Sequence, residues 1–266
     1  MPELFPSLPA YFTSLVVIAC AMFVYATVGF GAGMVAVALL AFVLPDLRGT
    51  VAVLMVLTCL TEVSVLSRNW RRAQPRLLVL LIVPMGVGLW IGTRILVSGD
   101  VSLLKRMLGV VIAAAGAWFL YSERHRSAGD PSPDPPHALA RTTQRVRNLL
   151  AVPVGLVSGV LGGMFGTGGP PVIILLRSYR LDKAAFRATL LAFFFTMTLI
   201  RAPLYWRNGT LTTQVLLAAI WLAPGAAAGT AAGMLAHRRL SERKFAVAVA
   251  VLLILLGILL LAGRGK

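Results

Sequence analysis

The sequence predicts an all-α polytopic membrane protein. Its 266 residues are 58% hydrophobic and only 13% charged, and the mean hydropathy is +0.86. A chain with so little polar surface cannot cover a water-soluble core of that size. Apolar runs recur from one end of the chain to the other without the period-2 alternation of a transmembrane β-barrel, which leaves membrane-spanning helices as the predicted structure.

The apolar runs predict about 8 to 10 membrane segments, because a helix needs roughly 20 residues to cross the hydrocarbon core. No Lys or Arg precedes the first run, unlike the basic start of a cleaved signal peptide, so we expect this run to be retained as a helix. In chain order the runs cover residues 11–28, 30–44, 51–66, 77–97, 103–121, 149–161, 172–176, 190–205, 215–236 and 245–262.

One long polar stretch divides the chain. Residues 122–148 are rich in Pro and uneven in charge, which is typical of a flexible linker. We therefore expect an N-terminal membrane repeat over residues 1–121, a cytoplasmic linker over 122–148, and a C-terminal membrane repeat over 149–266.

The two halves resemble each other at five places that occur in the same order, which predicts two homologous repeats. A Phe-Gly-x-Gly sequence begins at Phe30 and again at Phe165. The matched pairs are residues 28–35 with 164–172, 48–56 with 187–195, Arg68 with Arg207, 84–92 with 224–233, and 104–116 with 242–257.

Strongly basic loops predict the orientation of the chain, since cytoplasmic loops of membrane proteins carry an excess of Lys and Arg. If these loops are all cytoplasmic, the stretch from Leu149 to Leu176 crosses the membrane twice, or dips in and returns, to bring Arg177 back to the linker's side. The same placement of the loops gives each half an odd number of membrane passes, which predicts that the second repeat is inverted relative to the first. We therefore interpret the net charge of +16 as a consequence of basic cytoplasmic loops and not as a sign of nucleic-acid binding. The basic loops are residues 67–76, the linker, 177–187 and 237–244.

Glycine-rich stretches interrupt the apolar runs at Gly29–Gly33 and at Gly166–Pro171. Gly permits a positive φ, and Pro at the first position of a helix lacks an N–H that would be unpaired there. The sequence "FGTGGPP" therefore predicts the end of one short helix, a turn at membrane depth, and the start of another. Broken backbone in the membrane is tolerated only where protein or water covers it. Broken or re-entrant helices are thus predicted at both stretches.

Two such breaks at corresponding positions of two repeats indicate the binding site of a transporter. Helix N-termini exposed there offer N–H groups and a positive dipole end, which suit an anion. We interpret other glycines, in 225–233 and at 86, 88 and 92, as close helix packing. The candidate binding residues at the breaks are Gly31, Gly33, Gly166, Thr167, Gly168, Gly169 and Pro170.

Two ionisable residues, Glu62 and Arg201, lie inside apolar runs and occupy equivalent positions in the repeat alignment. Charged groups at that depth are costly and mark functional sites. They predict an ion pair or a shared substrate pocket, in which Arg201 and Thr198 bind an oxyanion and Glu62 carries a coupling proton. The alternative is that both side chains snorkel to the nearby interface.

No cofactor, metal site or catalytic residue is predicted. The two cysteines lie in apolar runs and no Gly-Lys-Ser/Thr ending of a P-loop ATPase is present. The three histidines lie in or beside basic loops, apart from any acidic or cysteine cluster, so no metal or acid–base constellation forms. These residues are Cys20, Cys59, His125, His137 and His237.

The pair of glycine-rich motifs, the run "GLVSGVLGGMFGTGGPPVIILL" and the segment of the "LKRMLGVVIAAAG" type that ends each half together resemble the sulfite exporter TauE/SafE family of bacterial membrane permeases. The resemblance covers nearly the whole chain apart from the linker. It implies a multi-pass carrier in the bacterial inner membrane for sulfite or small organosulfonates, usually in export and without a known cofactor. The first motif, "GFGAGM", departs from the family, which more often shows another glycine and a nearby proline there.

We therefore expect a secondary transporter of small sulfur oxyanions that works by alternating access. In the absence of an ATP motif, transport runs down a gradient or is coupled to protons or other ions. The expected partners are a small anionic substrate and the lipid bilayer, with no nucleic acid. The alternatives are a permease for another small anion, such as thiosulfate or a carboxylate, in the uptake direction, a non-transporting membrane subunit, and an intramembrane enzyme.

Overall fold

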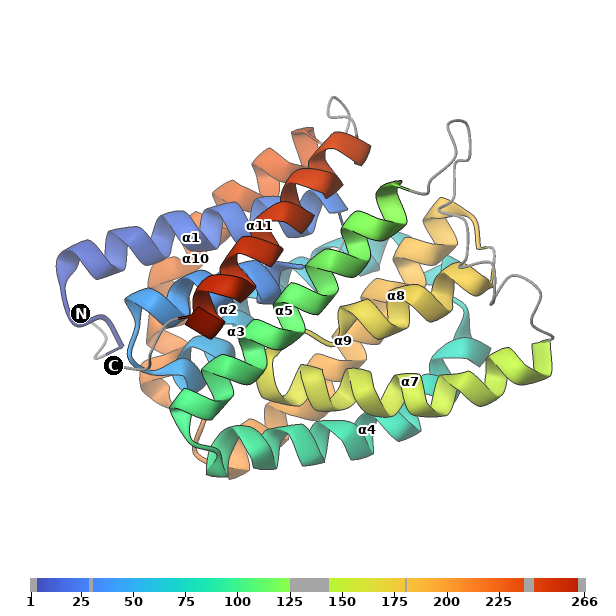
Figure 1. The fold of residues 1–266 in the computed structure, drawn as a ribbon, viewed down its shortest axis with the longest axis horizontal. Helices are drawn as coiled ribbons and strands as arrows, with labels where there is room; N and C mark the ends of the chain where they lie inside the picture. The colour runs from blue at the N-terminus through green and yellow to red at the C-terminus, as the bar shows by residue number, and fades with distance from the viewer. Residues whose placement is uncertain (1–3, 29–30, 125–143, 180, 237–241, 263–266) are drawn as a thin grey trace.

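The computed structural model describes residues 4–28, 31–124, 144–179, 181–236 and 242–262 (Figure 1). These residues form ten α-helices, one 3-10 turn and no strand, so the all-α prediction is confirmed. The elements are α1 (Leu8–Val28), α2 (Ala32–Val43), α3 (Leu47–Asn69), η1 (Trp70–Arg72), α4 (Pro75–Ser98), α5 (Val101–Arg124), α7 (Gln144–Phe165), α8 (Gly169–Ser178), α9 (Lys183–Arg207), α10 (Thr213–Ala236) and α11 (Glu242–Ala262).

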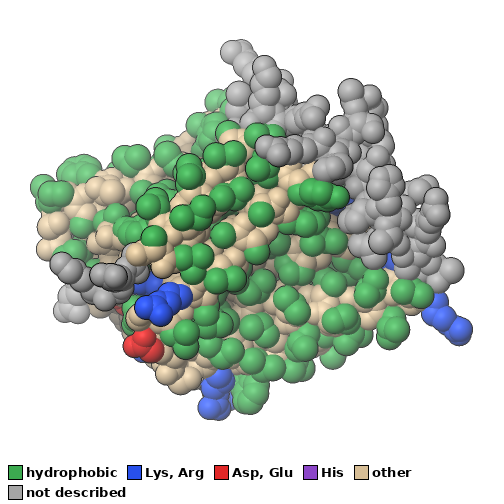
Figure 2. Space-filling view, in the orientation of Figure 1, with side chains coloured by type: hydrophobic (Ala, Val, Ile, Leu, Met, Phe, Trp, Pro, Cys, Tyr) green, Lys and Arg blue, Asp and Glu red, His purple; other side chains and the backbone are tan. Residues whose placement is uncertain are grey.

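Six of the described helices, α1, α4, α5, α7, α9 and α10, are long and apolar enough to cross a membrane. Large hydrophobic side chains are exposed on them, and they cover most of the face seen in Figure 2, as lipid-facing surfaces require. The chain is a multi-pass membrane protein. Helices α2 and α8 have only 12 and 10 residues; at 1.5 Å per residue they reach about half-way through the hydrocarbon core.

The second half begins with a helical hairpin. Arg147, near the start of α7, donates to the carbonyl oxygen of Ser178 at the end of α8 (2.6 Å), and Tyr179 donates to Asn148 (3.0 Å). The first turn of α7 and the last turn of α8 therefore lie at the same end of the molecule. The predicted return of the chain between Leu149 and Leu176 is confirmed. The prediction of two short helices is wrong for α7, which has 22 residues, because only α8 starts within the membrane depth.

The turn of this hairpin folds back along α7. Gly168 packs on the backbone of Ser158, seven residues before the end of α7. Helix α8 therefore begins at the level of Ser158 and not at the far end of α7. Its N-terminus lies inside the layer that the longer helices cross.

The first half begins with a similar hairpin. Gly31 approaches Val24 of α1, and Leu4, which precedes α1, packs on Gly49 near the start of α3. Helix α2 thus returns toward the end at which α1 begins, and its N-terminus also lies at depth. The backbone of residues 29 and 30 lies outside the described residues.

Contacts between described residues that flank the basic loops join helix ends from both halves of the chain. Arg177 donates to Ser122 at the end of α5, and the N–H of Gln74 donates to Thr189 in the second turn of α9. Arg187 donates to the carbonyl oxygen of Ala26. Near the end of α1, Thr27 reaches the carbonyl oxygen of Gly233 in the last turn of α10.

Three pairs of helices pack side by side over most of their length: α4 with α7, α1 with α10, and α5 with α11. Each pair joins one helix of the first half to one of the second, and Figure 1 shows α4 along α7 and α5 beside α11. Glycines permit the close approach, since a Cβ at Gly163 would lie 2.6 Å from the carbonyl oxygen of Leu89, and one at Gly225 2.8 Å from that of Leu15.

The packing interpretation is confirmed for most of the glycines to which it was applied. Side chains at Gly88 and Gly92 would collide with the backbone of α7, and those at Gly229 and Gly233 with the backbone of α1. The interpretation is wrong for Gly86, because no atom lies within 4 Å of a Cβ built there. Among the residues that the structure describes, no helix approaches α4 at Gly86.

The polar stretch between the halves is shorter than the linker of 122–148 suggests. Helix α5 continues to Arg124 and α7 begins at Gln144. Residues 125–143, and with them His125 and His137, lie outside the described residues, as does His237.

Candidate functional site

The two helix breaks meet in the interior of the protein. We call residues 31–33, which lead into α2, the first break, and residues 166–168, between α7 and α8, the second break. Gly31 (φ 95°) and Gly166 (φ 69°) adopt the left-handed conformation that favours glycine. A Cβ at Gly33 would lie 2.6 Å from the carbonyl oxygen of Gly166, so the start of α2 rests against the backbone of the second break.

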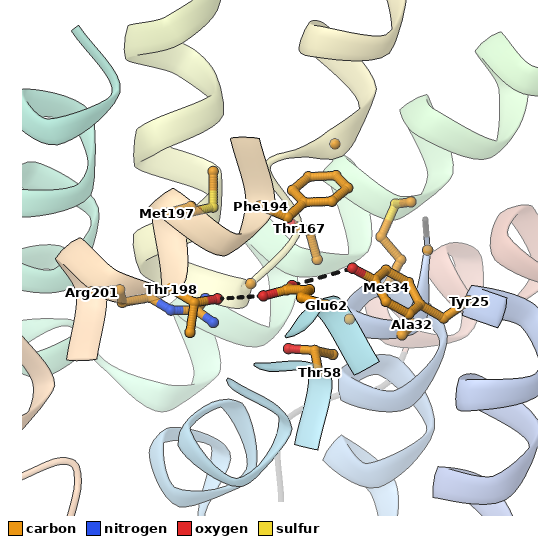
Figure 3. Close-up of a pocket in the computed structure, with 14 residues that line it drawn as sticks. Tyr25, Ala32, Met34, Thr58, Glu62, Thr167, Phe194, Met197, Thr198 and Arg201 are labelled. Atoms are coloured by element: carbon orange, nitrogen blue, oxygen red, sulfur yellow. Dashed lines mark hydrogen bonds between the residues drawn. The ribbon is translucent and has the colours of Figure 1, made fainter. Parts of the chain in front are cut away.

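A pocket opens where the breaks meet (Figure 3). Its empty volume is about 450 Å³ with the open mouth included. Its wall combines the N-termini of α2 and α8 with side chains of α1, α3 and α9. The lining residues are Tyr25, Gly31, Ala32, Gly33, Met34, Thr58, Glu62, Gly166, Thr167, Gly169, Phe194, Met197, Thr198 and Arg201.

Arg201 is buried and tied to the broken end of α7. Only 4% of the residue is exposed, so it does not snorkel to the interface. Its Nη1 donates to the carbonyl oxygen of Gly162 (2.6 Å), in the last turn of α7, and its guanidinium lies over the ring of Tyr205. The hydroxyl of Tyr205 donates to the carbonyl oxygen of Gly163 (2.7 Å). Two side chains of α9 thus bind carbonyl groups in the last turn of α7, and the carbonyl oxygen of Gly162 also accepts a hydrogen bond from the N–H of Gly166.

Glu62 is equally buried, with 3% exposed, and does not snorkel either. Its Oε1 accepts a hydrogen bond from the hydroxyl of Tyr25 (3.2 Å), and its Oε2 accepts one from Thr198 (3.1 Å). The two donors come from α1 and α9, so the carboxylate on α3 links three helices. Figure 3 shows Glu62 between these two donors.

The two intramembrane charges share the pocket but hold different partners. Arg201 is bound to the carbonyl group of Gly162 in α7, whereas Glu62 is bound to hydroxyl groups of α1 and α9. Of the two arrangements that the sequence predicts, an ion pair or a shared pocket, the hydrogen bonds correspond to the shared pocket.

The family model described as sulfite exporter TauE/SafE matches residues 14–260. The chain belongs to this family. Comparison with curated proteins and with solved structures gave no match. Membership makes the chain a membrane permease of the sulfite exporter TauE/SafE type, in accordance with its multi-pass fold and with a location in the bacterial inner membrane.

In this TauE/SafE protein the pocket contains most of the candidate residues. Those that line it are Gly31, Gly33, Gly166, Thr167, Gly169, Thr198, Arg201 and Glu62. Two candidates do not line the pocket. Gly168 packs on Ser158 and Met197, where a side chain would collide with both, and Pro170 is buried in the first turn of α8. The lack of a side chain at Gly168 lets the second break fold back on α7.

Sequence reasoning missed six lining residues: Tyr25, Ala32, Met34, Thr58, Phe194 and Met197. Residues three, four and seven positions before Arg201 lie on the same face of a helix as Arg201. This spacing is a signal that could have identified Phe194 and Met197 together with Thr198. Thr58 lies one turn before Glu62 in the same way. No local pattern distinguishes Tyr25, which reaches Glu62 from 37 residues away.

The described residues contain no group of three or more His, Cys, Asp or Glu side chains that could hold a metal ion. The polar groups of the pocket are one carboxylate, one guanidinium, hydroxyls and backbone amides. Such a set binds and releases a polar or anionic solute through hydrogen bonds and charge.

Proposed function

We propose that this TauE/SafE permease is a secondary transporter that carries small sulfur oxyanions, such as sulfite or an organosulfonate, out of the cell by alternating access. The observation that carries the proposal is that both helix breaks and both intramembrane charges line one pocket. A binding site at the junction of discontinuous helices is the arrangement that secondary transporters use.

The electrostatics of the pocket favour an anion. Helices α2 and α8 both direct their N-terminal, positive dipole ends at it, because their first residues Ala32 and Gly169 are in its wall. The guanidinium of Arg201 adds a full positive charge that stays within the protein interior. Burial strengthens these interactions relative to those in water.

Glu62 supports coupling to protons. When ionised, it balances the charge of Arg201, and a bound anion then adds a second negative charge to the pocket. Protonation of Glu62 leaves Arg201 unbalanced and favours the anion. The other ionisable side chains near Glu62 are Tyr25, which donates to it, and Cys59, one turn earlier on α3. A proton and an anion therefore travel together in this proposal, with Glu62 as the proton carrier, and the outward gradient of the anion, not the inward proton gradient, drives export.

Contacts between helices support an inverted repeat. Matching the halves in chain order pairs α1 with α7, α3 with α9, α4 with α10 and α5 with α11. If each helix is replaced by its equivalent in the other half, the pair α1 and α10 becomes the pair α7 and α4, and both pairs are in contact. The pairs α5 with α11 and α3 with α9 each join two equivalent helices, and these pairs are in contact as well. Gly116 packs on Ala250, and Gly257 packs on Gly109, as this replacement requires.

The directions of the helices support the inversion. Helix α1 ends beside the basic-loop end of α10, whereas α7 starts at the basic-loop end. Equivalent helices thus run in opposite directions. Two inverted halves around one pocket provide two related conformations, each open to one side, which is the basis of alternating access.

The test is flux into proteoliposomes. We expect saturable uptake of radiolabelled sulfite and of radiolabelled methanesulfonate, whose sulfonate stays anionic across the pH range, and stimulation of both by an acidic exterior. Glu62→Gln removes the titrating group and keeps a hydrogen-bonding side chain. We expect it to retain exchange of anion for anion but to lose the stimulation by the pH gradient.

Asp46→Asn is the matched control, since Asp46 caps the start of α3 through Arg48 and lies outside the pocket. It should respond to the pH gradient as the wild type does. Inhibition of sulfite uptake by thiosulfate and by small carboxylates shows which of these anions the protein prefers. Flux no greater than in empty liposomes for every anion, from protein that elutes as a folded species, would overturn the proposed function.

A further inference from the structure

The two breaks differ in the backbone donors that they present to the pocket. The N–H groups of the first three residues of a helix have no partner within that helix. In α2 these residues are Ala32, Gly33 and Met34, and all three line the pocket. In α8 the second and third residues are Pro170 and Pro171, which have no N–H. The start of α2 is therefore richer in hydrogen-bond donors.

An unpartnered hydroxyl provides an independent observation at the same place. Thr167 lines the pocket with only 3% of the residue exposed, and its Oγ1 has no hydrogen-bond partner among the residues that the structure describes. In the view of Figure 3 it lies between Phe194 and Glu62. A buried polar group without a partner is costly unless a ligand or water satisfies it.

Thr167 differs in this respect from the other hydroxyls of the pocket. Tyr25 and Thr198 donate to Glu62, and Thr58 donates to the carbonyl oxygen of Met55 in its own helix. Of the hydroxyl groups in the lining, only that of Thr167 is without a partner in the part of the chain described. Among the hydroxyl groups of the lining, that of Thr167 is thus the one that a bound molecule can engage; Nε of Arg201 is the other buried donor of the lining without a partner among the described residues.

The contact between the breaks brings these donors close together. Gly33, the second residue of α2, rests against the carbonyl group of Gly166, and Thr167 is the next residue of the chain. A ligand in the pocket is therefore within reach of both the N–H groups of α2 and the hydroxyl of Thr167. An oxyanion head such as –SO₃⁻ directs oxygen atoms to several sides at once and suits this arrangement.

We propose that the transported anion is bound between the N-terminus of α2 and the hydroxyl of Thr167, and that Arg201 is a positioning residue that holds the second break. The proposal rests on the proposed anion transport. Nη1 of Arg201 is engaged by Gly162 and lies beside Gly166, where a Cβ would be 3.1 Å from it. Arg201 thus fixes the backbone that carries Thr167 and contributes charge from behind it.

The first test removes the hydroxyl. Thr167→Val deletes the donor and keeps the branched shape, and we expect the KM for methanesulfonate and the Kd of sulfite for the purified protein to rise roughly tenfold, the loss expected for one hydrogen bond to a charged group. Vmax should change less than KM. Thr167→Ser restores a hydroxyl and should recover most of the affinity. Thr196→Val, on α9, removes a hydroxyl that donates to Ala192 outside the pocket, and it should keep the wild-type KM.

The second test removes one backbone N–H. Ala32→Pro changes the first residue of α2, a position where proline is compatible with a helix, and it is expected to weaken anion binding by a similar factor. Ala32→Gly keeps the N–H and should bind the anion more tightly than Ala32→Pro. Size-exclusion profiles and thermal unfolding of all variants show whether the fold is retained.

The outcomes separate the two proposals. If wild-type protein transports the anion and both Thr167→Val and Ala32→Pro keep the wild-type KM and Kd, the inferred position of the anion is wrong while the proposed function stands. Loss of transport with unchanged Kd would also overturn the inferred position. If the wild type moves no anion, the proposed function itself is wrong.

Discussion

The first and second breaks look alike in sequence but are held in different ways. Both contain a glycine at positive φ, Gly31 and Gly166, and both lead into a short helix. In the second break, however, Arg201 and Tyr205 bind the carbonyl groups at the end of α7, and the next helix begins with prolines in place of N–H donors. The first break lines the pocket with Gly31 and the first residues of α2.

We infer from this difference that the second break mainly supports the site and that the first mainly contacts the solute. The only side-chain donor that the second break contributes to the pocket is Thr167. Two related sequence motifs have thus taken different parts in one site, and each part can be tested by matched substitutions.

The largest effect is expected where the two breaks touch. Gly33→Ala places a methyl group 2.6 Å from the carbonyl oxygen of Gly166, and since both partners are backbone, the breaks must separate, at a cost of about 1–3 kcal/mol for overpacking. We expect transport of methanesulfonate to fall to the background of empty liposomes. Gly86→Ala, which meets no atom within 4 Å, is the control and should transport normally. Normal flux in Gly33→Ala would show that the contact is dispensable.

The anchor of the second break comes next. Arg201→Met removes the donor of Gly162 and the buried charge, so it should lower both the thermal unfolding temperature and the flux. Tyr205→Phe removes only the donor of Gly163, and an unsatisfied buried carbonyl costs roughly 1–3 kcal/mol. We expect Tyr205→Phe to reduce stability while its KM stays close to that of the wild type. Thermal unfolding followed by size-exclusion chromatography, with flux assays in parallel, distinguishes the two. A raised KM in Tyr205→Phe at unchanged stability would contradict the supporting part given to this break.

A direct comparison of the positive-φ glycines gives a smaller effect. Alanine at either position costs about 1–2 kcal/mol because of the left-handed backbone. At Gly166 the new methyl group also meets Nη1 of Arg201 at 3.1 Å, whereas at Gly31 the nearest atoms are 3.9 Å away. We therefore expect Gly166→Ala to lower the unfolding temperature more than Gly31→Ala does. The reverse order would show that the first break carries more of the stability.

The smallest effect is expected from Pro170→Ala. This change gives the second residue of α8 an N–H, which makes the second break more like the first. Pro170 does not line the pocket, so the new donor should change the KM for methanesulfonate less than Ala32→Pro does. A KM change larger than that of Ala32→Pro would mean that α8, and not α2, provides the main backbone contact to the anion.

Part of the site could be predicted from the sequence because its signals are local. Glycines next to prolines inside an apolar run indicate a break, and charged residues inside such runs stand out by hydropathy. The excess of Lys and Arg around Arg177 predicts that α8 returns to the linker's end, which the contact of Arg147 with Ser178 confirms. These inferences need only the thickness of a membrane and the cost of burying charge.

Other features of the site could not be predicted, because they depend on partners far apart in the chain. Arg201 lies 39 residues from Gly162, to which it donates, and Glu62 lies 136 residues from Thr198. No pattern of either segment shows that the guanidinium is engaged by backbone or that the carboxylate is held by two hydroxyls.

By itself the sequence determined the class of fold and the positions of the breaks, because a bilayer requires long apolar segments whose backbone groups are paired within each helix. Only the tertiary structure decided that the breaks meet at Gly33 and Gly166, and that Thr167 keeps an unpartnered hydroxyl in the pocket. The physical reason is that hydrogen bonds between helices use up most of the polar groups. Which group remains for a ligand depends on packing between segments that are distant in sequence.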